Sequence, residues 1–416
     1  MQHLCHKITI LITALVMSIA CFAHEAEING ISYNLNKKTK EACVREKSKK
    51  QSGNITIPSV VTYCGIDYKV TSIARRAFYN SSDLTSVTMP ESVKTIGSEA
   101  FSHCSNITSI ILSETVKSIN DSAFFGCSSL KTIALPKSLR RIGEQAFSEC
   151  GNLSSIDIPE SVVQIGKYAF IKCRGLTSVK IPRHVASIGE GVFACCPEIT
   201  SIIVDKENKY YDSRNNCNAI INTNTNELVS GCMNTVIPNN VKRIGNYAFG
   251  VCFWDQENPA SIILPDSVTS IGDNAFSACI GMASITLPKS LVTIGKEAFM
   301  EDHFLSSIII PDSVTSIAEG AFFNCVSLKS ITLPKSLTNI GYDAFNGCSF
   351  SSVTILSKTP PEIPNLSFFD TTIDTLGENI LQKRIDLHVP KGCKEAYQNH
   401  KKWKDYNIID DVDLNY

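Results

Sequence analysis

The chain has 416 residues, of which 43% are hydrophobic, so it can bury a large core and is not a disordered protein. Its 39 Lys and Arg balance 40 Asp and Glu, and this near-neutral charge argues against binding to nucleic acid or to an anionic membrane surface. Eight scattered histidines and two tryptophans are not typical of a cofactor-dependent enzyme.

Residues 1–23 have the pattern of a secretory signal peptide. An apolar stretch that ends at Ala20 follows a basic residue, and small residues lead to a predicted cleavage site after Ala23. The stretch has about 13 residues, too few for a bilayer span of about 20. Acylation of Cys21 is the alternative, although Ser18 stands where a lipoprotein signal has Leu. We therefore predict a secreted or surface-displayed protein whose mature part has no transmembrane helix.

Residues 24–54 are polar and precede the first regular repeat. A repeat protein needs a polar cover where its first unit would expose an unpaired strand edge. We therefore predict that 24–54 is an N-terminal cap, with a small strand that starts at Ile31.

A motif that ends in Phe recurs throughout residues 55–350. Eleven phenylalanines end an Ala-Phe pair (Val-Phe once), and their spacing is 23 residues except for one interval of 56 and one of 27: Phe78, Phe101, Phe124, Phe147, Phe170, Phe193, Phe249, Phe276, Phe299, Phe322 and Phe345. The unit from Leu130 to Cys150 shows the consensus L-x-x-I-x-L-P-x-x-V-x-x-I-G-x-x-A-F-x-x-C. A fixed period of this length is the signature of a repeat architecture.

The first half of each unit predicts a strand. Ile133 and Leu135 alternate with polar residues, as in a strand that is buried on one side. Pro136 ends this strand because it has no N–H for the ladder. Leu139 and Ile142 then form a second apolar step, which is compatible with a short strand on the opposite side.

The second half of each unit predicts tight turns. Gly143 indicates a turn with positive φ, and Asn120 and Ala318 are the substitutes in this slot. Ala146 and Phe147 then start a short helical turn, in which the small Ala allows close approach and Phe fills the coil. No unit of 23 residues can bury its own apolar face, but stacked coils can, with parallel strands about 4.8 Å apart. The sequence therefore predicts one β-rich solenoid of short parallel strands and short helical turns.

This repeat resembles the BspA-type (treponemal) class of leucine-rich repeat, over roughly residues 55–350. The tail resembles the usual ending of that family, with Pro360-Pro361 and the segment from Leu387 to Gly392. The resemblance implies a right-handed leucine-rich repeat coil in a secreted or surface protein. It also implies an adhesin-like role, binding host or neighbouring-cell proteins, without enzymatic chemistry in the repeat.

The interval of 56 residues contains an insertion, residues 203–236, which we call the island. Its short apolar runs between Asn, Ser and Gly clusters predict hairpin-like structure, serving either as a spacer or as a lobe of a ligand surface. Tyr210 and Tyr211 are candidate partner-binding residues there. The interval of 27 adds Phe253 and Trp254, which either anchor a partner or cover the island.

Residues 351–416 are predicted to form the C-terminal cap, with Trp403 and Tyr406 over the last coil. No sorting signal is evident after Trp403.

Fifteen of the 17 cysteines lie after the signal segment, and nine recur in one slot of the repeat. Such recurrence indicates a packing requirement, so we predict buried thiols, with a disulfide ladder as the alternative. Cys217 and Cys232 could form a bridge within the island. Spacing typical of a metal site is missing, and so are the motifs of nucleophile elbows, zinc proteases and phosphate loops. We therefore predict no enzyme activity, no metal and no cofactor.

Outward strand positions carry repeated hydroxyl residues, including the candidate binding residues Thr132, Ser155 and Ser178. They either suit strand edges and solubility or form a broad binding face. We predict a monomeric, adhesin-like protein that binds extracellular or neighbouring-cell proteins, with glycans as a further partner class, through the solenoid face and the island. The alternative is a structural spacer of the envelope without a specific ligand.

Overall fold

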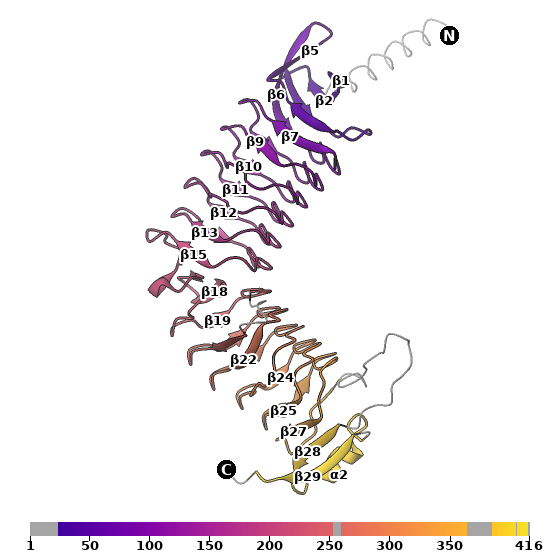
Figure 1. Cartoon of the computed structure of the whole chain (residues 1–416), viewed down its shortest axis with the longest axis vertical. Coiled ribbons are helices and arrows are strands. Elements are labelled where there is room, and N and C mark those ends of the chain that lie inside the picture. Colours follow the sequence, from indigo (N-terminus) through magenta and orange to yellow (C-terminus); the bar gives the residue numbers. More distant parts are fainter. Residues whose placement is uncertain (1–23, 253–258, 364–384, 405, 415–416) are drawn as a thin grey trace, which may run out of the picture. The chain divides into compact units, whose positions relative to one another are not determined.

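The computed structural model describes residues 24–252, 259–363, 385–404 and 406–414. The predicted signal peptide lies outside the described residues. The chain forms two compact units. Unit 1 contains residues 24–175 with Ser187–Gly189, and unit 2 contains Leu176–Ala186 with the chain from Glu190 onward. Both units are β-solenoids of the leucine-rich repeat type (Figure 1).

Unit 1 contains two sheets. The longer sheet has the order β1 (His24–Ile28), β2 (Ile31–Asn36), β3 (Glu41–Val44), β6 (Ile66–Ile73), β8 (Thr95–Ile96), β10 (Ser118–Ile119), β11 (Arg141–Ile142), β12 (Gln164–Ile165) and β14 (Ser187–Ile188). Strand β5 (Val60–Tyr63) pairs antiparallel with β6. The second sheet consists of β4 (Gly53–Thr56), β7 (Leu84–Thr88) and β9 (Ser109–Ile111).

Unit 2 repeats this plan. Its longer sheet has the order β16 (Tyr211–Asp212), β17 (Ile220–Asn222), β18 (Glu227–Ser230), β19 (Arg243–Ile244), β21 (Ser270–Ile271), β23 (Thr293–Ile294), β24 (Ser316–Ile317) and β26 (Asn339–Ile340). The other strands are β13 (Ser178–Ile181) with β15 (Ser201–Val204), β20 (Ala260–Ile263) with β22 (Met282–Thr286), and the four-stranded sheet β25 (Ser330–Leu333), β27 (Ser352–Ile355), β28 (Asp386–Pro390) and β29 (Asn407–Val412). Helical structure in the described residues is limited to η1 (Arg214–Asn216) and α2 (Lys394–Asn399).

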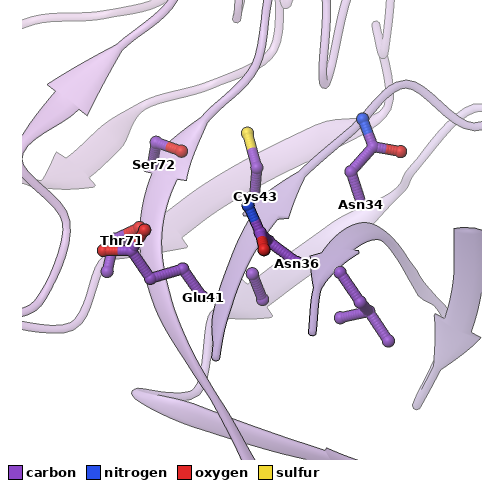
Figure 2. Close-up of a pocket in the computed structure, with 8 residues that line it drawn as sticks. Asn34, Asn36, Glu41, Cys43, Thr71 and Ser72 are labelled. Carbon is purple, nitrogen blue, oxygen red and sulfur yellow. The ribbon is translucent and has the colours of Figure 1, made fainter. Parts of the chain in front are cut away.

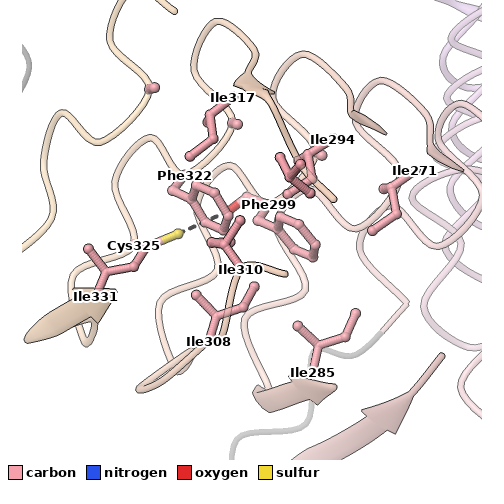
Figure 3. Packing of buried hydrophobic residues seen from close by; sticks show 14 of the residues in the cluster. Ile271, Ile285, Ile294, Phe299, Ile308, Ile310, Ile317, Phe322, Cys325 and Ile331 are labelled. Carbon is pink, nitrogen blue, oxygen red and sulfur yellow. Dashed lines mark hydrogen bonds between the residues drawn. The ribbon is translucent and has the colours of Figure 1, made fainter. Parts of the chain in front are cut away.

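Stacked coils place identical residue types above one another. Ile119 pairs with Ile142, and Ile271 pairs with Ile294, in parallel register. The phenylalanines of successive coils stack face to face, with ring centroids 5.0–5.5 Å apart. Figure 3 shows this core in unit 2, where Phe299 and Phe322 lie between isoleucines of the two strand positions. This ladder is the core that no single repeat could form.

The predicted short helical turns are tight turns closed by i→i+3 hydrogen bonds, such as Phe125 N–H to Ser122 O at 3.1 Å. In each of the eleven repeats, the residue two positions before Phe and the residue two positions after it have positive φ, as Glu99 and His103 do around Phe101. This conformation is unfavourable for non-glycine residues, but hydrogen bonds to the next coil stabilise it. The N–H of Glu99 donates to Asp121 O, and that of His103 to Phe125 O.

The prediction that the repeated Gly has positive φ is wrong. Gly143 does not lie in the left-handed region, whereas a Cβ built on it would come within 2.6 Å of the backbone of the preceding coil. For Gly341 the corresponding distance is 2.4 Å. The slot therefore requires Gly because two backbones approach closely, as glycine alone allows.

The repeated cysteines are thiols that are buried as the sequence predicts, except for the half-buried Cys348, and no disulfide joins the cysteines of the described chain. The Cys150 thiol donates to Phe124 O at 3.2 Å, and the Cys325 thiol donates to Phe299 O at 3.0 Å (Figure 3). Each bond links one coil to the carbonyl of the coil before it. Cys217 and Cys232 in the island are also thiols, so the possible bridge between them is not formed.

The island begins the longer sheet of unit 2 in the way that residues 24–54 begin that of unit 1. Strands β1, β2 and β3 pair antiparallel before β3 joins β6 in parallel, and β16, β17 and β18 do the same before β18 joins β19. Both hairpins have the sequence N-x-x-T-x-E, at 36–41 and at 222–227. The Asn36 side-chain oxygen accepts two loop N–H groups at 3.0 and 3.1 Å, and that of Asn222 accepts two at 3.0 and 3.2 Å.

The last described segments continue the sheet that begins with β25. β27, β28 and β29 pair in parallel. Trp403 is fully buried, and its indole N–H donates to Pro361 O at 2.8 Å. The Tyr397 hydroxyl donates to Ser357 O at 2.8 Å, so both aromatic residues tie α2 and the following turn to the preceding coil.

Candidate interaction surfaces

The first half of each coil contains the long strands β7, β9, β13, β15, β20, β22, β25 and β27. We call the outer side of these half-coils the long-strand face, and it carries the hydroxyl residues that the sequence singled out. The first residue of each outward pair serves the stacking of coils. Thr108 Oγ1 donates to Thr85 O, and Ser154 Oγ donates to Lys131 O, both at 3.4 Å. These side chains are exposed, but their hydroxyls already bond the preceding coil.

The second residue of each pair faces outward. Thr132, Ser155 and Ser178 are exposed, and their side chains form no hydrogen bond within the described residues. Sequence alternation therefore located these side chains correctly on the surface. Whether they bind a partner stays a prediction.

In unit 2, the long-strand face also has an exposed row that we call the Ile/Thr stripe: Ile263, Thr286, Ile309 and Thr332. Ile263 is 74% exposed and Ile309 is 80% exposed. Ile263 pairs with Thr286, and Ile309 with Thr332, so apolar and hydroxyl residues alternate along the stripe. Next to it, the Ser284 hydroxyl donates to Ser261 Oγ at 2.9 Å. Exposed β-branched residues in register form a ready surface for a partner.

The candidate aromatic anchors lie in different environments. Phe253 and Trp254 fall outside the described residues. Tyr210 is 44% exposed. Tyr211, the first residue of β16, is only 5% exposed, so a surface role does not fit this side chain. The reason is strand alternation, which turns one of two adjacent tyrosines inward.

The island is part of the fold of unit 2. Its residues Ile221 and Leu228 are fully buried in the hydrophobic core, together with Ile244 of the next coil. Its exposed large hydrophobic residues are Ile203, Tyr210, Met233 and Val236. The island therefore offers a partner individual side chains, while its strands complete the sheet.

A shallow pocket of about 250 Å³ lies in unit 1 on the outer side of β2, β3 and β6. Figure 2 shows the side chains that line it. They are Asn34, Leu35, Asn36, Glu41, Ala42, Cys43, Thr71 and Ser72. Burial raises the pKa of the Cys43 thiol, while a hydrogen bond with Ser72 acts in the opposite direction. A raised pKa leaves the thiol protonated at neutral pH, which does not suit a nucleophile.

The titratable groups of the core fit a structural role. Burial raises the pKa of Cys104 and of Cys150 to about 12. Burial also raises the pKa of Asp302 well above its usual value. In the described ranges, His, Cys, Asp and Glu form no group of three or more that could hold a metal ion.

The repeat region matches a known protein family. The BspA type leucine rich repeat region matches in six copies, over residues 58–153, 94–221 and 250–374. The chain belongs to the BspA-type leucine-rich repeat family. This family supplies protein-interaction scaffolds, and the repeat itself is a scaffold element. None of the curated proteins matches the chain.

Three solved structures resemble this BspA-type chain. A leucine rich cell surface protein from Faecalibacterium prausnitzii is 28% identical, with a TM-score of 0.66, over 80% of this chain and 94% of that one. A leucine-rich repeat protein from Bacteroides ovatus is 26% identical, with a TM-score of 0.57, over 93% and 100%. The pneumococcal vaccine antigen PcpA shares the fold at 21% identity, with a TM-score of 0.75, over 94% and 99%. Within the described residues, no helix combines the length and apolar character needed to cross a membrane.

Sequence reasoning missed one recurring group. A Ser two residues after the repeated Pro donates to a carbonyl of the preceding coil, as Ser138 does to Val116 O and Ser161 to Leu139 O, both at 2.7 Å. The signal was present as P-x-S in most units. These serines stabilise the stack, so their recurrence does not indicate a ligand.

Proposed function

We propose that this protein is a secreted or surface-displayed, adhesin-like scaffold, and that the long-strand face of unit 2 binds an extracellular protein. The Ile/Thr stripe carries the proposal. Residues 1–23 would direct export, and the segments 24–54 and 351–416 would cap the ends of the repeat region. The similarity to a bacterial cell surface protein supports this location.

The chemistry of the stripe favours a protein partner. Exposed Ile263 and Ile309 offer apolar area that gains from leaving water, while Thr286 and the neighbouring serines offer hydrogen bonds. A flat face of this kind buries area without enclosing a small molecule, so a few central residues would supply most of the affinity. Tyr210 of the island is a further exposed aromatic residue available to such a partner.

The test is binding of the mature chain, residues 24–416, to purified extracellular proteins that it captures and that are identified by mass spectrometry. We expect Ile263→Ser with Ile309→Ser to weaken binding at least about tenfold, since each side chain would lose contact area at the centre of the interface. The matched control is Val163→Ser with Val292→Ser, because these exposed residues lie beside the short strands β12 and β23. Equal affinity of both double variants and the wild type would rule out the stripe.

Point substitutions are preferable to deletion of the island. Removing 203–236 would take β17 and β18 out of the sheet and Leu228 out of the core, so lost binding would only report misfolding. The second candidate function is a structural spacer of the envelope. Absence of saturable binding to every captured protein would favour the spacer.

A further inference from the structure

The two units carry opposite net charges. The described residues of unit 1 contain 19 Lys and Arg against 14 Asp and Glu, a net charge of +5. The described residues of unit 2 contain 17 Lys and Arg against 20 Asp and Glu, a net charge of −3. The balanced total of the whole chain therefore conceals a basic unit, and such asymmetry points to an anionic partner for unit 1.

Part of this charge is ordered into a row beside the short strands of unit 1. We call Lys94, Lys117 and Arg140 the basic row. The backbone N–H of Lys117 donates to Lys94 O at 3.0 Å, and that of Arg140 to Lys117 O at 2.9 Å, so the three residues lie on adjacent coils. All three side chains are exposed, and none forms an ion pair with an acid in the described part of the chain.

Acidic side chains of the same coils are engaged elsewhere. Glu91 accepts the backbone N–H of Glu114, and Glu114 accepts that of Lys137, both at 3.2 Å. Asp121 pairs with Arg141 at 2.9 Å. Like charges on neighbouring coils repel, so an anion that lies along the basic row would relieve this repulsion.

Polar groups accompany the basic row. Ser72, Thr95, Ser118, Arg141 and Gln164 follow one another in parallel register on β6, β8, β10, β11 and β12. The pocket of Figure 2 lies at the start of this register, with Thr71 and Ser72 in its wall. Thr71 also precedes the basic row directly, because its carbonyl accepts the N–H of Lys94 at 3.0 Å.

We propose that the basic row binds a linear anionic polysaccharide, with sulfated or uronic-acid sugars, along the direction in which the coils stack. Cations repeat at about the 4.8 Å spacing of paired strands, and each ring of an extended polysaccharide advances by a comparable distance. The row of Ser, Thr and Gln side chains can bond sugar hydroxyls. This inference concerns a different unit and a different sheet from the proposed protein-binding stripe.

Other occupants fit less well. A second copy of the chain would need a matching acidic row, but at successive coils of unit 2 the residue after the repeated Pro alternates in sign, as Asp266, Lys289, Asp312 and Lys335 show. Aromatic residues, on which the bases of single-stranded nucleic acid stack, are not among the residues of the basic row or its polar neighbours. A membrane surface would not require cations in a single file.

The test measures binding of the full mature chain to a size-defined heparin oligosaccharide and to polygalacturonate at several salt concentrations. Neutral dextran and a single-stranded DNA of equal charge serve as comparison probes. We expect the variant Lys94→Ser, Lys117→Ser, Arg140→Ser to lose about 10- to 100-fold in affinity for one or both anionic glycans. The slope of log affinity against log salt should fall in magnitude by about two to three.

The matched control is Lys49→Ser, Lys131→Ser, Lys137→Ser, which removes the same charge from exposed positions of unit 1 outside the basic row. It should change affinity less than about threefold, and thermal melting should show that both variants fold. Equal losses in the two variants would overturn the proposal, because net charge alone would then explain binding. Absence of glycan binding by the wild type, or DNA binding of equal strength, would also overturn it. If the wild type bound the anionic glycans but captured no extracellular protein, only the proposed function would be refuted.

Discussion

Asp302 occupies the slot in which most units have Cys, and its replacement should stabilise unit 2. The side chain is fully buried, its Oδ1 accepts the N–H of Cys279 at 2.8 Å, and Oδ2 has no partner among the described residues. In the neighbouring coils, Cys279 and Cys325 donate to phenylalanine carbonyls at 3.1 and 3.0 Å. Asp302→Cys restores such a donor and removes a buried polar atom without a partner. We expect the free energy of unfolding to rise by about 1–3 kcal/mol.

The same residue predicts a dependence on pH. Burial, with the nearby Cys325 as a second cause, raises the pKa of Asp302 well above its usual value in the folded protein. Between the ordinary aspartate pKa of about 3.9 and the folded pKa, the unfolded chain is ionised while the folded protein keeps its proton. The folded state thus binds more protons, and stability falls as pH rises through this window, by up to about 1.4 kcal/mol per pH unit.

Urea unfolding of the wild type and Asp302→Cys from pH 4.5 to 8 would measure both effects. The difference between the two proteins should grow with pH and be smallest at pH 4.5. Asp266→Asn is the control, since Asp266 is exposed and its replacement should leave the pH profile unchanged. A difference that stays constant across this range, or an Asp302→Cys variant that is less stable at pH 8, would refute the reasoning.

Three further predictions concern the repeat. Gly143→Ala should cost about 1–3 kcal/mol in urea unfolding because its Cβ would lie 2.6 Å from backbone, whereas Gly151→Ala, with open space, should cost little; equal effects would contradict the close-approach explanation. At pH 8 and under native conditions, iodoacetamide should label exposed Cys64 and spare Cys150, because burial raises the pKa of Cys150 to about 12. Labelled Cys150 in the mass spectrum would contradict the burial of the repeated thiols. Asn222→Ala should lower the unfolding free energy by about 1–2 kcal/mol, because two loop N–H groups lose their acceptor, and an unchanged urea midpoint would exclude this role.

The regular coils could be predicted because their periodicity has one physical meaning. Ile133 is buried and Phe147 recurs once per coil, so the core follows directly from the period, although the structure has no strand at residues 131–135, where the alternation predicts one. The role of Gly143 could not, since glycine serves both positive φ and close approach, and one sequence does not distinguish them. Positive φ occurs instead at ordinary residues such as Gln145, where hydrogen bonds between coils impose it.

The candidate surfaces were predictable to a smaller extent. Alternation placed Thr132 and Ser155 outside correctly, whereas both Tyr210 and Tyr211 were taken as candidates although alternation along a strand turns Tyr211 inward. The place of Ile309 in a stripe with Ile263 depends on which coils pair, which the sequence alone does not show. Lys94, Lys117 and Arg140 recur every 23 residues in the sequence, but their place on adjacent coils depends on the hydrogen bonds between those coils.

The island is best understood as an internal cap. A spacer would need only length, but residues 222–227 reproduce the hairpin of 36–41 down to the two N–H groups that bind the Asn side chain. In both hairpins the residue with positive φ, Lys40 or Asn226, offers its carbonyl to the first strand of the following repeat, at 2.9 Å in each case. A device that starts one solenoid sheet therefore starts the other as well. This explains why the chain tolerates 33 residues beyond its period at this position.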